Sequence, residues 1–312
     1  MANLYARAGA LRCKEVSPSC PVENSIYGYA PSLVWSALFL GIFAVSTIAH
    51  TVQGIRYKTW SFMIAMTIGG LCEAVGEIGR LMMHRNPFSD VGFKIQIILL
   101  TFAPAFLAAG IYLQLKHLVL TFGAEWSVLR PSLYTWIFII CDIFSIALQG
   151  AGGGIAATVQ VTNSLFNVGN NITIAGLAFQ VFTLLVFGML ALEYLFRTVK
   201  THKHELNPAT STLRRTLKFK LFLCAIILAY TTILIRCVYR VAELAGGWSR
   251  KNQILRDETL FLALDSFMVS IAIVGFNLFH PGACFDFKKL GGAAQEKRDT
   301  TPSEEQMSSQ TQ

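Results

Sequence analysis

Long apolar segments constrain this chain more than any other feature. Seven of them lie near 31–52, 60–83, 95–115, 133–153, 174–196, 217–238 and 259–280. A helix needs about 20 mostly apolar residues to cross the hydrocarbon core of a bilayer. The segments are too long for strands and lack the alternation of a transmembrane barrel. The sequence therefore predicts an all-α fold, a polytopic membrane protein built as a bundle of seven transmembrane helices.

One membrane domain and two tails account for the whole sequence. We expect a tail at 1–30, the seven-helix domain at 31–282, and a polar, disordered tail at 283–312. Residues 1–30 contain neither the apolar core nor the cleavage site of a signal peptide. We therefore expect the first span to act as its own insertion signal.

Basic residues indicate which ends of the spans face the cytosol. They gather in the connections after the first, third and fifth spans and in the C-terminal tail, whereas the connection after the fourth span has none. The positive-inside rule then places the N-terminus outside and the C-terminus in the cytosol. A net charge of +8 could suggest nucleic acid. Its placement instead indicates contact with anionic lipid headgroups, so we expect no nucleic-acid binding.

Three residues mark the expected outer side. Asn171 begins an Asn-Ile-Thr glycosylation sequon in what the topology makes an outside loop. Cys13 and Cys20 lie on the outside tail and could form a disulfide. The other five cysteines lie in or beside spans, where small apolar filler is the simplest interpretation. No CxxC pair occurs, so no metal site of that type is expected.

Two charged stretches interrupt the second and sixth spans, CEAVGEIGR at 72–80 and RCVYRVAE at 236–243. A charge at the centre of a span costs about 2.5–3.5 kcal/mol on the insertion scale. The charged positions follow the spacing i, i+4, i+7, which puts each triple on one helix face. The signs are reversed between the stretches, so we expect the triples to pair near the outer end of the bilayer. They are Glu73, Glu77 and Arg80, and Arg236, Arg240 and Glu243.

Other polar groups are expected at the same depth, near the outer end of the bilayer. Asp142 and Gln149 lie on the fourth span, and Glu258 and Asp265 on the outer half of the seventh. One interpretation is a buried ion-pair network that only fixes helix packing. The other is a polar cavity, open to the outside, that receives a charged or amphipathic ligand. We favour the cavity because the groups are numerous and come from several spans.

Proline and glycine mark two further places. Pro104 lies in the middle of the third span, where a proline frees a backbone carbonyl and bends the helix. Gly150 and Gly154 end the fourth span in a GxxxG spacing. That spacing is typical of close helix packing, and the alternative is a close approach of backbone and ligand.

Several functional classes lack the residues they require. The last span has no lysine for a retinal Schiff base, and the six histidines lie at span ends or in connections rather than at membrane depth. No GxSxG elbow, Gly-rich phosphate loop or HExxH motif occurs. We therefore expect no enzymatic activity, no metal and no cofactor. A receptor would have to come from a lineage without the common DRY and NPxxY signatures.

Several ordered motifs resemble one known family. They are YGYAPSL, EAVGEIGR, FAPAFLAAGIYLQLK, FIICDIFSIALQGAGGG, AGLAFQVF, IRCVYRVAELAGG and the closing HPG. From 27 to 282 the chain resembles the fungal lipid-translocating exporters, also called the aminocholesterol-resistance-like family. The resemblance implies a seven-span protein of the plasma membrane or, alternatively, of a vacuolar or other endomembrane. Family members are linked to export of sphingoid long-chain bases, to resistance to sterol analogues and drugs, and to porphyrin uptake.

The resemblance also implies a set of site residues. Glu77 departs from the family pattern, which more often has an aromatic there, and the added acid favours a cationic amine. The positions that match family motifs are Glu73, Arg80, Asp142, Gln149, Arg236, Arg240, Glu243 and Asp265.

We expect a transporter or translocase of an amphipathic lipid or hydrophobic small molecule. The alternative is a seven-span lipid or stress sensor without transport activity. The sequence carries no signal for an oligomeric state.

Overall fold

Long helices make up most of the structure. The computed structural model describes residues 13–122, 131–158, 164–198, 216–247 and 252–284. Within these ranges seven helical segments are long and apolar enough to cross a membrane, which confirms the predicted fold class. The first six are α2 (Leu33–Tyr57), α3 (Trp60–Arg85), α4 (Asp90–Phe122), α5 (Pro131–Thr158), α6 (Ser164–Phe196) and α8 (Leu217–Ala245). The seventh span is built from α10 (Glu258–Phe261), the π-helical turn η5 (Leu262–Ser266), α11 (Phe267–Leu278) and α12 (Pro281–Cys284).

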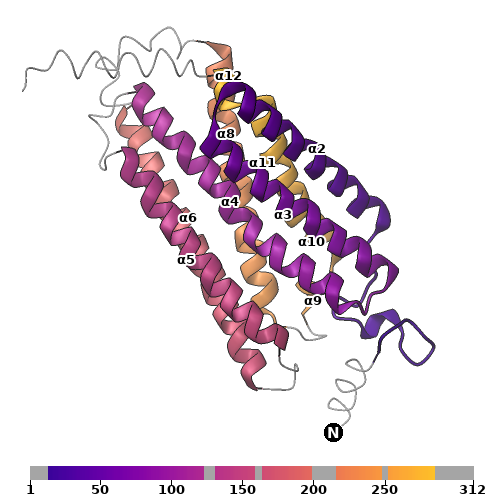
Figure 1. The fold of residues 1–312 in the computed structure, drawn as a ribbon. Helices are drawn as coiled ribbons and strands as arrows, with labels where there is room; N and C mark the ends of the chain where they lie inside the picture. The colour runs from indigo at the N-terminus through magenta and orange to yellow at the C-terminus, as the bar shows by residue number, and fades with distance from the viewer. Residues whose placement is uncertain (1–12, 123–130, 159–163, 199–215, 248–251, 285–312) are drawn as a thin grey trace, which may run out of the picture.

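The spanning helices form a closed ring. Each packs beside its neighbour in sequence, from α2 through α3, α4, α5, α6 and α8 to α11, and α11 returns to α2 (Figure 1). Helix α4 also contacts α8 across the interior. Short connections favour such antiparallel neighbours. The interior is therefore lined by α3, α4, α8 and the seventh span.

Apolar side chains lie on the outside of the helix bundle and charged side chains lie inside it, as contact with lipid requires. Val45 is 68% exposed and Trp136 65% exposed on the lateral surface. The guanidinium groups of Arg80, Arg236 and Arg240, in contrast, are fully buried. Such a large exposed apolar surface is unfavourable in water but suits contact with lipid chains. The chain is accordingly a multi-pass membrane protein.

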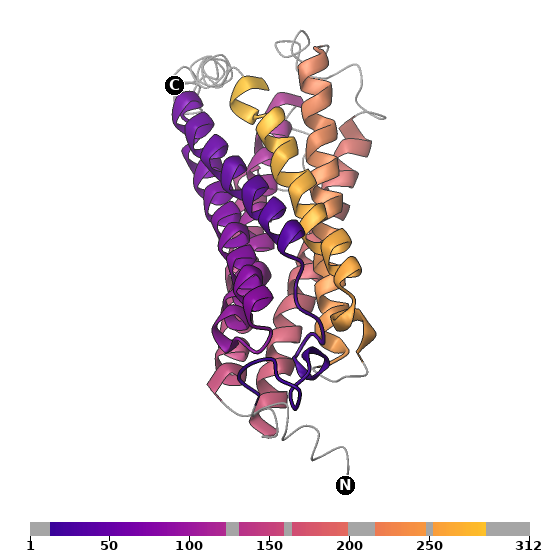
Figure 2. The same cartoon turned by 90° about the vertical axis from the view of Figure 1, so that its right-hand side faces the viewer.

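The two ends of the bundle differ in what covers them. Residues 13–32 and the short helix α9 (Gln253–Arg256) lie at one end, which we call the N-terminal end (Figure 2). Helix α12 lies at the opposite end, where it contacts α2 and α8. Arg56, Lys58, Lys218 and Lys220 lie at that opposite end. Their position agrees with a cytosolic α12 end, although the orientation itself stays a prediction.

Three details differ from the sequence prediction. Helix α6 begins at Ser164, so Asn171 lies exposed on a helix rather than in a loop. The close approach of α5 and α6 uses other glycines than the GxxxG pair: a Cβ on Gly152 would lie 2.5 Å from the Gly169 carbonyl oxygen. A Cβ on Gly154 would meet nothing within 4 Å, so the packing interpretation was wrong there. The disordered tail predicted at 283–312 lies, beyond Cys284, outside the described residues.

Candidate functional site

A charge cluster lies between α3, α8 and the seventh span. Seven of its side chains are almost fully buried, and the Glu258 side chain is 24% exposed. Its members are Glu73, Glu77 and Arg80 of α3, Arg236, Arg240 and Glu243 of α8, Glu258 of α10 and Asp265 of η5.

Arg236 connects three elements of the bundle. One terminal nitrogen donates to Glu73 on α3, and its Nε donates to Asp265 Oδ1 at 2.8 Å. The other terminal nitrogen donates to the Leu100 carbonyl on α4 at 2.8 Å. Leu100 precedes Pro104 by four residues, and proline has no N–H to bond that carbonyl. The proline therefore leaves an acceptor free for Arg236.

Arg240 lies one turn further along α8. Its Nη1 donates to Glu243 Oε2 at 2.6 Å, and its Nε lies 2.9 Å from Asp265 Oδ1. Asp265 therefore holds both Arg236 and Arg240. Bonds between charged groups of this kind are stronger than neutral ones, and they fix the seventh span against α8.

Arg80 connects α3 to the N-terminal end. Its Nη2 donates to Glu258 Oε1 at 2.8 Å, and its Nε donates to Ser36 Oγ on α2 at 3.3 Å and lies 3.7 Å from Glu77 Oε2. Its Cζ lies 4.1 Å from the centroid of the Phe261 ring, where a cation–π interaction is favourable.

The π-helical turn η5 joins the two predicted triples. Asp265 accepts a hydrogen bond from Arg236 and forms an ion pair with Arg240, while the next residue, Ser266, donates to Glu77 Oε1 on α3 at 2.8 Å. Turns of this kind often occur at functional sites. The triples do meet, as predicted, through the direct ion pair of Glu73 and Arg236. The other ion pairs of the charge cluster among the described residues run within a triple or to the seventh span.

Two predicted site residues lie outside the charge cluster. The Asp142 carboxyl is buried on α5, and neither of its oxygens has a hydrogen-bond partner or an ion pair among the described residues. Gln149 bonds Gln180 of α6 at 3.1 Å and Ser145 at 2.7 Å. The Gln149–Gln180 bond joins α5 to α6. We find no bond from either residue to the charge cluster among the described residues.

The charge cluster leaves polar atoms without hydrogen-bond partners among the described residues. They include Oε2 of Glu73, Oε1 of Glu243, Nη1 of Arg80 and Nη2 of Arg240. Buried polar atoms normally have partners, so the cluster has capacity for water or for a ligand head group. Its five carboxylates face three guanidinium groups, which gives a formal excess of two negative charges.

Residues 13–32 close the N-terminal end over the charge cluster. Cys13 and Cys20 form a disulfide with Cα atoms 5.9 Å apart. The Ser32 amide donates to Glu258 Oε1 at 2.7 Å, and the Pro31 carbonyl lies 2.8 Å from His84 Nδ1. Burial raises the pKa of Tyr29, which lies beside Arg80, to about 12, so its phenol stays protonated at neutral pH.

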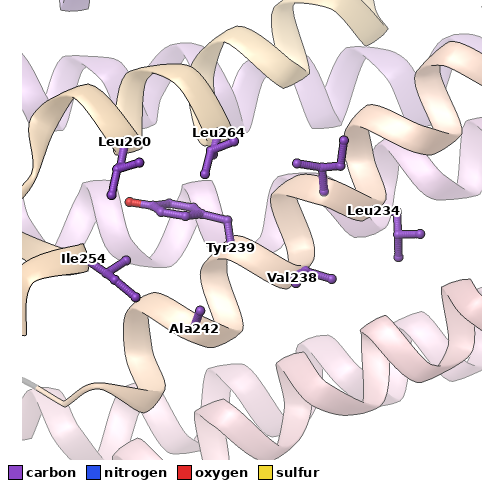
Figure 3. A pocket seen from close by; sticks show the side chains of 8 residues that line it. Leu234, Val238, Tyr239, Ala242, Ile254, Leu260 and Leu264 are labelled. Atoms are coloured by element: carbon purple, nitrogen blue, oxygen red, sulfur yellow. The ribbon is translucent and has the colours of Figure 1, made fainter.

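Two hollows flank this end of the bundle. The apolar groove, of about 460 Å³, lies between α8 and the start of the seventh span (Figure 3). The polar hollow, of about 450 Å³, includes Glu258 and so touches the charge cluster. The apolar groove is lined by Leu234, Ile235, Val238, Tyr239, Ala242, Ile254, Leu260 and Leu264. The polar hollow is lined by Tyr29, Gln253, Arg256, Asp257 and Glu258.

Sequence reasoning missed the uncharged partners of the cluster. Phe261 stacks on Arg80, Ser266 bonds Glu77, and Tyr239 lines the apolar groove. Phe261 precedes Asp265 by four residues, a spacing that would have placed both on one helix face. No group of three or more His, Cys, Asp and Glu side chains within the described ranges is arranged to hold a metal ion.

These features define a class of protein, a polytopic seven-helix membrane protein with a buried ionic site. A family model described as RTA1 like protein matches residues 66–288, and the chain belongs to this family. This finding confirms the resemblance drawn from the sequence motifs.

Three curated relatives are similar over most of their length. The chain is 34% identical over 293 residues to a protein of Saccharomyces cerevisiae named sphingoid long-chain base transporter RSB1, covering 85% of this chain and 76% of the relative. It is 24% identical to the probable lipid transporter atnI of Emericella nidulans, covering 85% and 73%. It is 25% identical to protoporphyrin uptake protein 1 of Saccharomyces cerevisiae, covering 81% and 91%. No solved structure matches the chain significantly.

Proposed function

We propose that this protein transports amphipathic lipids such as sphingoid long-chain bases, or related sterol-like or porphyrin compounds, and so confers resistance to toxic lipids or drugs. The observation that carries the proposal is the charge cluster within the span region, in which five carboxyl groups face three guanidinium groups. Ionisable groups at membrane depth are expensive and generally serve a ligand or ion. The names of the three relatives point to the same class of cargo and to transport rather than catalysis.

The carboxylates supply what a cationic head group needs in the bilayer. An ammonium group has three donors and no acceptor, and the cluster offers unpaired carboxylate oxygens on Glu73 and Glu243. Glu258 bonds Arg80 within the cluster and also lines the polar hollow. A bound head group can therefore pass from one carboxylate to the next, from Glu73 and Glu243 in the interior to Glu258 at the N-terminal end.

Reconstitution tests the proposal. Purified protein in liposomes is expected to move a labelled long-chain base between leaflets faster than protein-free liposomes do. Glu73→Gln keeps the side-chain shape but removes the charge that faces Arg236, so we expect much slower movement. Equal rates for the protein and for empty liposomes would contradict transport. Binding of the base without movement would instead favour the lipid or stress sensor.

A further inference from the structure

The apolar groove opens onto the lateral surface that faces lipid. Val238 is half exposed, and Ala242 and Leu260 are exposed as well. Figure 3 shows these side chains arranged along α8 and the facing helix of the seventh span, with Ile254 at one end. A hydrocarbon chain can reach this groove from within the leaflet without crossing water. Its volume of about 460 Å³ lies within the range of about 300–1,000 Å³ typical of ligand pockets.

One buried hydroxyl on the wall of the groove, that of Tyr239, has no hydrogen-bond partner among the described residues. Tyr239 is 6% exposed, and its ring lines the groove. Glu243 follows one helical turn later, on the same face of α8. Its Oε2 accepts from Arg240, whereas its Oε1 accepts from no described residue. Two buried oxygens, one on the wall of the groove and one a helical turn further along α8, therefore lack a donor among the described residues.

The charge cluster beside the groove determines which lipid head group can bind there. The charge cluster carries a formal excess of two negative charges. A phosphate group offers the Glu243 oxygen no donor, whereas an ammonium has three N–H donors for the Tyr239 and Glu243 oxygens.

At the N-terminal end the polar hollow reaches Glu258 but is not lined by Glu243. Residues 13–32 lie over the cluster, where the Ser32 amide bonds Glu258 and the Tyr27 ring is buried. Gly28 lies against the Arg256 guanidinium, so the segment is also packed on α9. The side of the bundle therefore offers a lipid the more direct path to Glu243.

We propose that the apolar groove is the lateral binding site for a single-chain lipid amine, whose hydrocarbon chain lies along Val238, Ala242 and Leu264 and whose ammonium contacts Tyr239 and Glu243. The proposal rests on the proposed function for the class of cargo and adds the place and the contacts of binding.

Photolabelling of the full-length protein tests the place of binding. The protein is embedded in phosphatidylcholine nanodiscs and labelled with a photoactivatable 18-carbon primary amine. Labelled peptides are expected at 234–242 and 254–264. Ala242→Trp fills the groove and should lower labelling about tenfold, as overpacking of a site implies. Ala147→Trp, at an exposed position of α5, is the matched control and should leave labelling unchanged.

Two further variants test the head-group contacts. Tyr239→Phe keeps the ring and breaks no ion pair, and loss of a bond to a charged group should weaken amine binding about tenfold. Binding of the uncharged N-acetylated analogue should be unaffected by this variant. Glu243→Gln should remove the preference for the amine over that analogue.

The outcomes separate this inference from the proposed function. Labels elsewhere on the bundle, equal losses with Ala242→Trp and Ala147→Trp, or equal competition by phosphatidylcholine would overturn the groove as an amine site. Transport that continues unchanged in Ala242→Trp would also overturn it, yet leave the transport function standing. Amine binding in the groove without movement between leaflets would support the inference and contradict transport.

Discussion

A single guanidinium, that of Arg236, ties α3, α4 and the seventh span to α8. Its partners are Glu73, the Leu100 carbonyl and Asp265. The helical spacing of the two charged stretches predicted that their side chains would share a face. It did not predict which residues pair, because partner choice depends on the depth and rotation of each helix.

A double-mutant cycle can measure the predicted pairing. Glu73→Gln and Arg236→Gln are each expected to destabilise the protein by about 3–5 kcal/mol, the usual effect of removing one partner of a buried pair. The double variant should lose clearly less than the sum, because the two side chains bond each other. Glu73→Gln with Arg240→Gln should be closer to additive, since these side chains do not bond. Equal coupling in both cycles, measured by unfolding of the purified protein, would contradict the observed pairing.

Two aspartates offer a matched comparison. Asp265→Asn removes a charge held by Arg236 and Arg240, and the loss of a buried network partner should lower the melting temperature strongly. Asp142→Asn removes no ion pair formed with described residues, so it should be neutral or slightly stabilising. Thermal unfolding in detergent compares the two variants. Similar losses in both would show that Asp142 has an ionic partner.

At the scale of elements, α4 lacks one helical hydrogen bond, and another helix uses the acceptor that is left free. Pro104 leaves the Leu100 carbonyl without its helical donor, and Arg236 uses it. The sequence predicted a freed carbonyl at this helix, but the identity of its donor depends on the packing of α4 against α8.

Pro104→Ala should separate stability from activity. An interior proline costs a helix about 3 kcal/mol, so the alanine should raise the melting temperature. The restored N–H then competes with Arg236 for the Leu100 carbonyl, and transport in liposomes should fall. Pro87→Ala, in the connection between α3 and α4, should change neither quantity. A variant that gains stability and keeps full transport would show that the Leu100 bond is dispensable.

Adjacent glycines on α5 should respond with opposite signs. A Cβ on Gly152 would meet the Gly169 carbonyl at 2.5 Å, whereas one on Gly153 would meet nothing within 4 Å. Gly152→Ala should therefore force α5 and α6 apart at about 1–3 kcal/mol. Gly153→Ala should be neutral or stabilising, because alanine favours helix. Melting temperatures of the two variants check this, and equal values would rule out the close approach.

The number of membrane spans was predictable from the sequence, whereas the start of α6 and the π-helical turn η5 were not. Apolar length alone predicts seven crossings, because few other structures can bury such segments in lipid. The polar first turns of α6 and the π-helical turn η5 depend on contacts with other helices, at Gly152 and at the arginines of α8 respectively. A hydropathy pattern cannot register such contacts.

At the scale of the whole molecule, the distribution of charge predicts the orientation in the membrane. The α12 end holds the basic residues of the α2–α3 connection and the start of α8. We expect an N-terminal epitope to be accessible on intact spheroplasts and a C-terminal epitope only after permeabilisation. The reverse pattern would invert the topology and place the charge cluster at the cytosolic side.

Because the apolar groove opens sideways toward lipid, the concentration of cargo within the membrane determines how much of the groove is occupied. A cargo that arrives through the leaflet is governed by its mole fraction among the membrane lipids, not by its amount in the surrounding water. Affinities quoted per litre would therefore shift with the quantity of membrane in an assay. Diluting the cargo with empty vesicles should lower occupancy even when the total amount of cargo and protein is held constant.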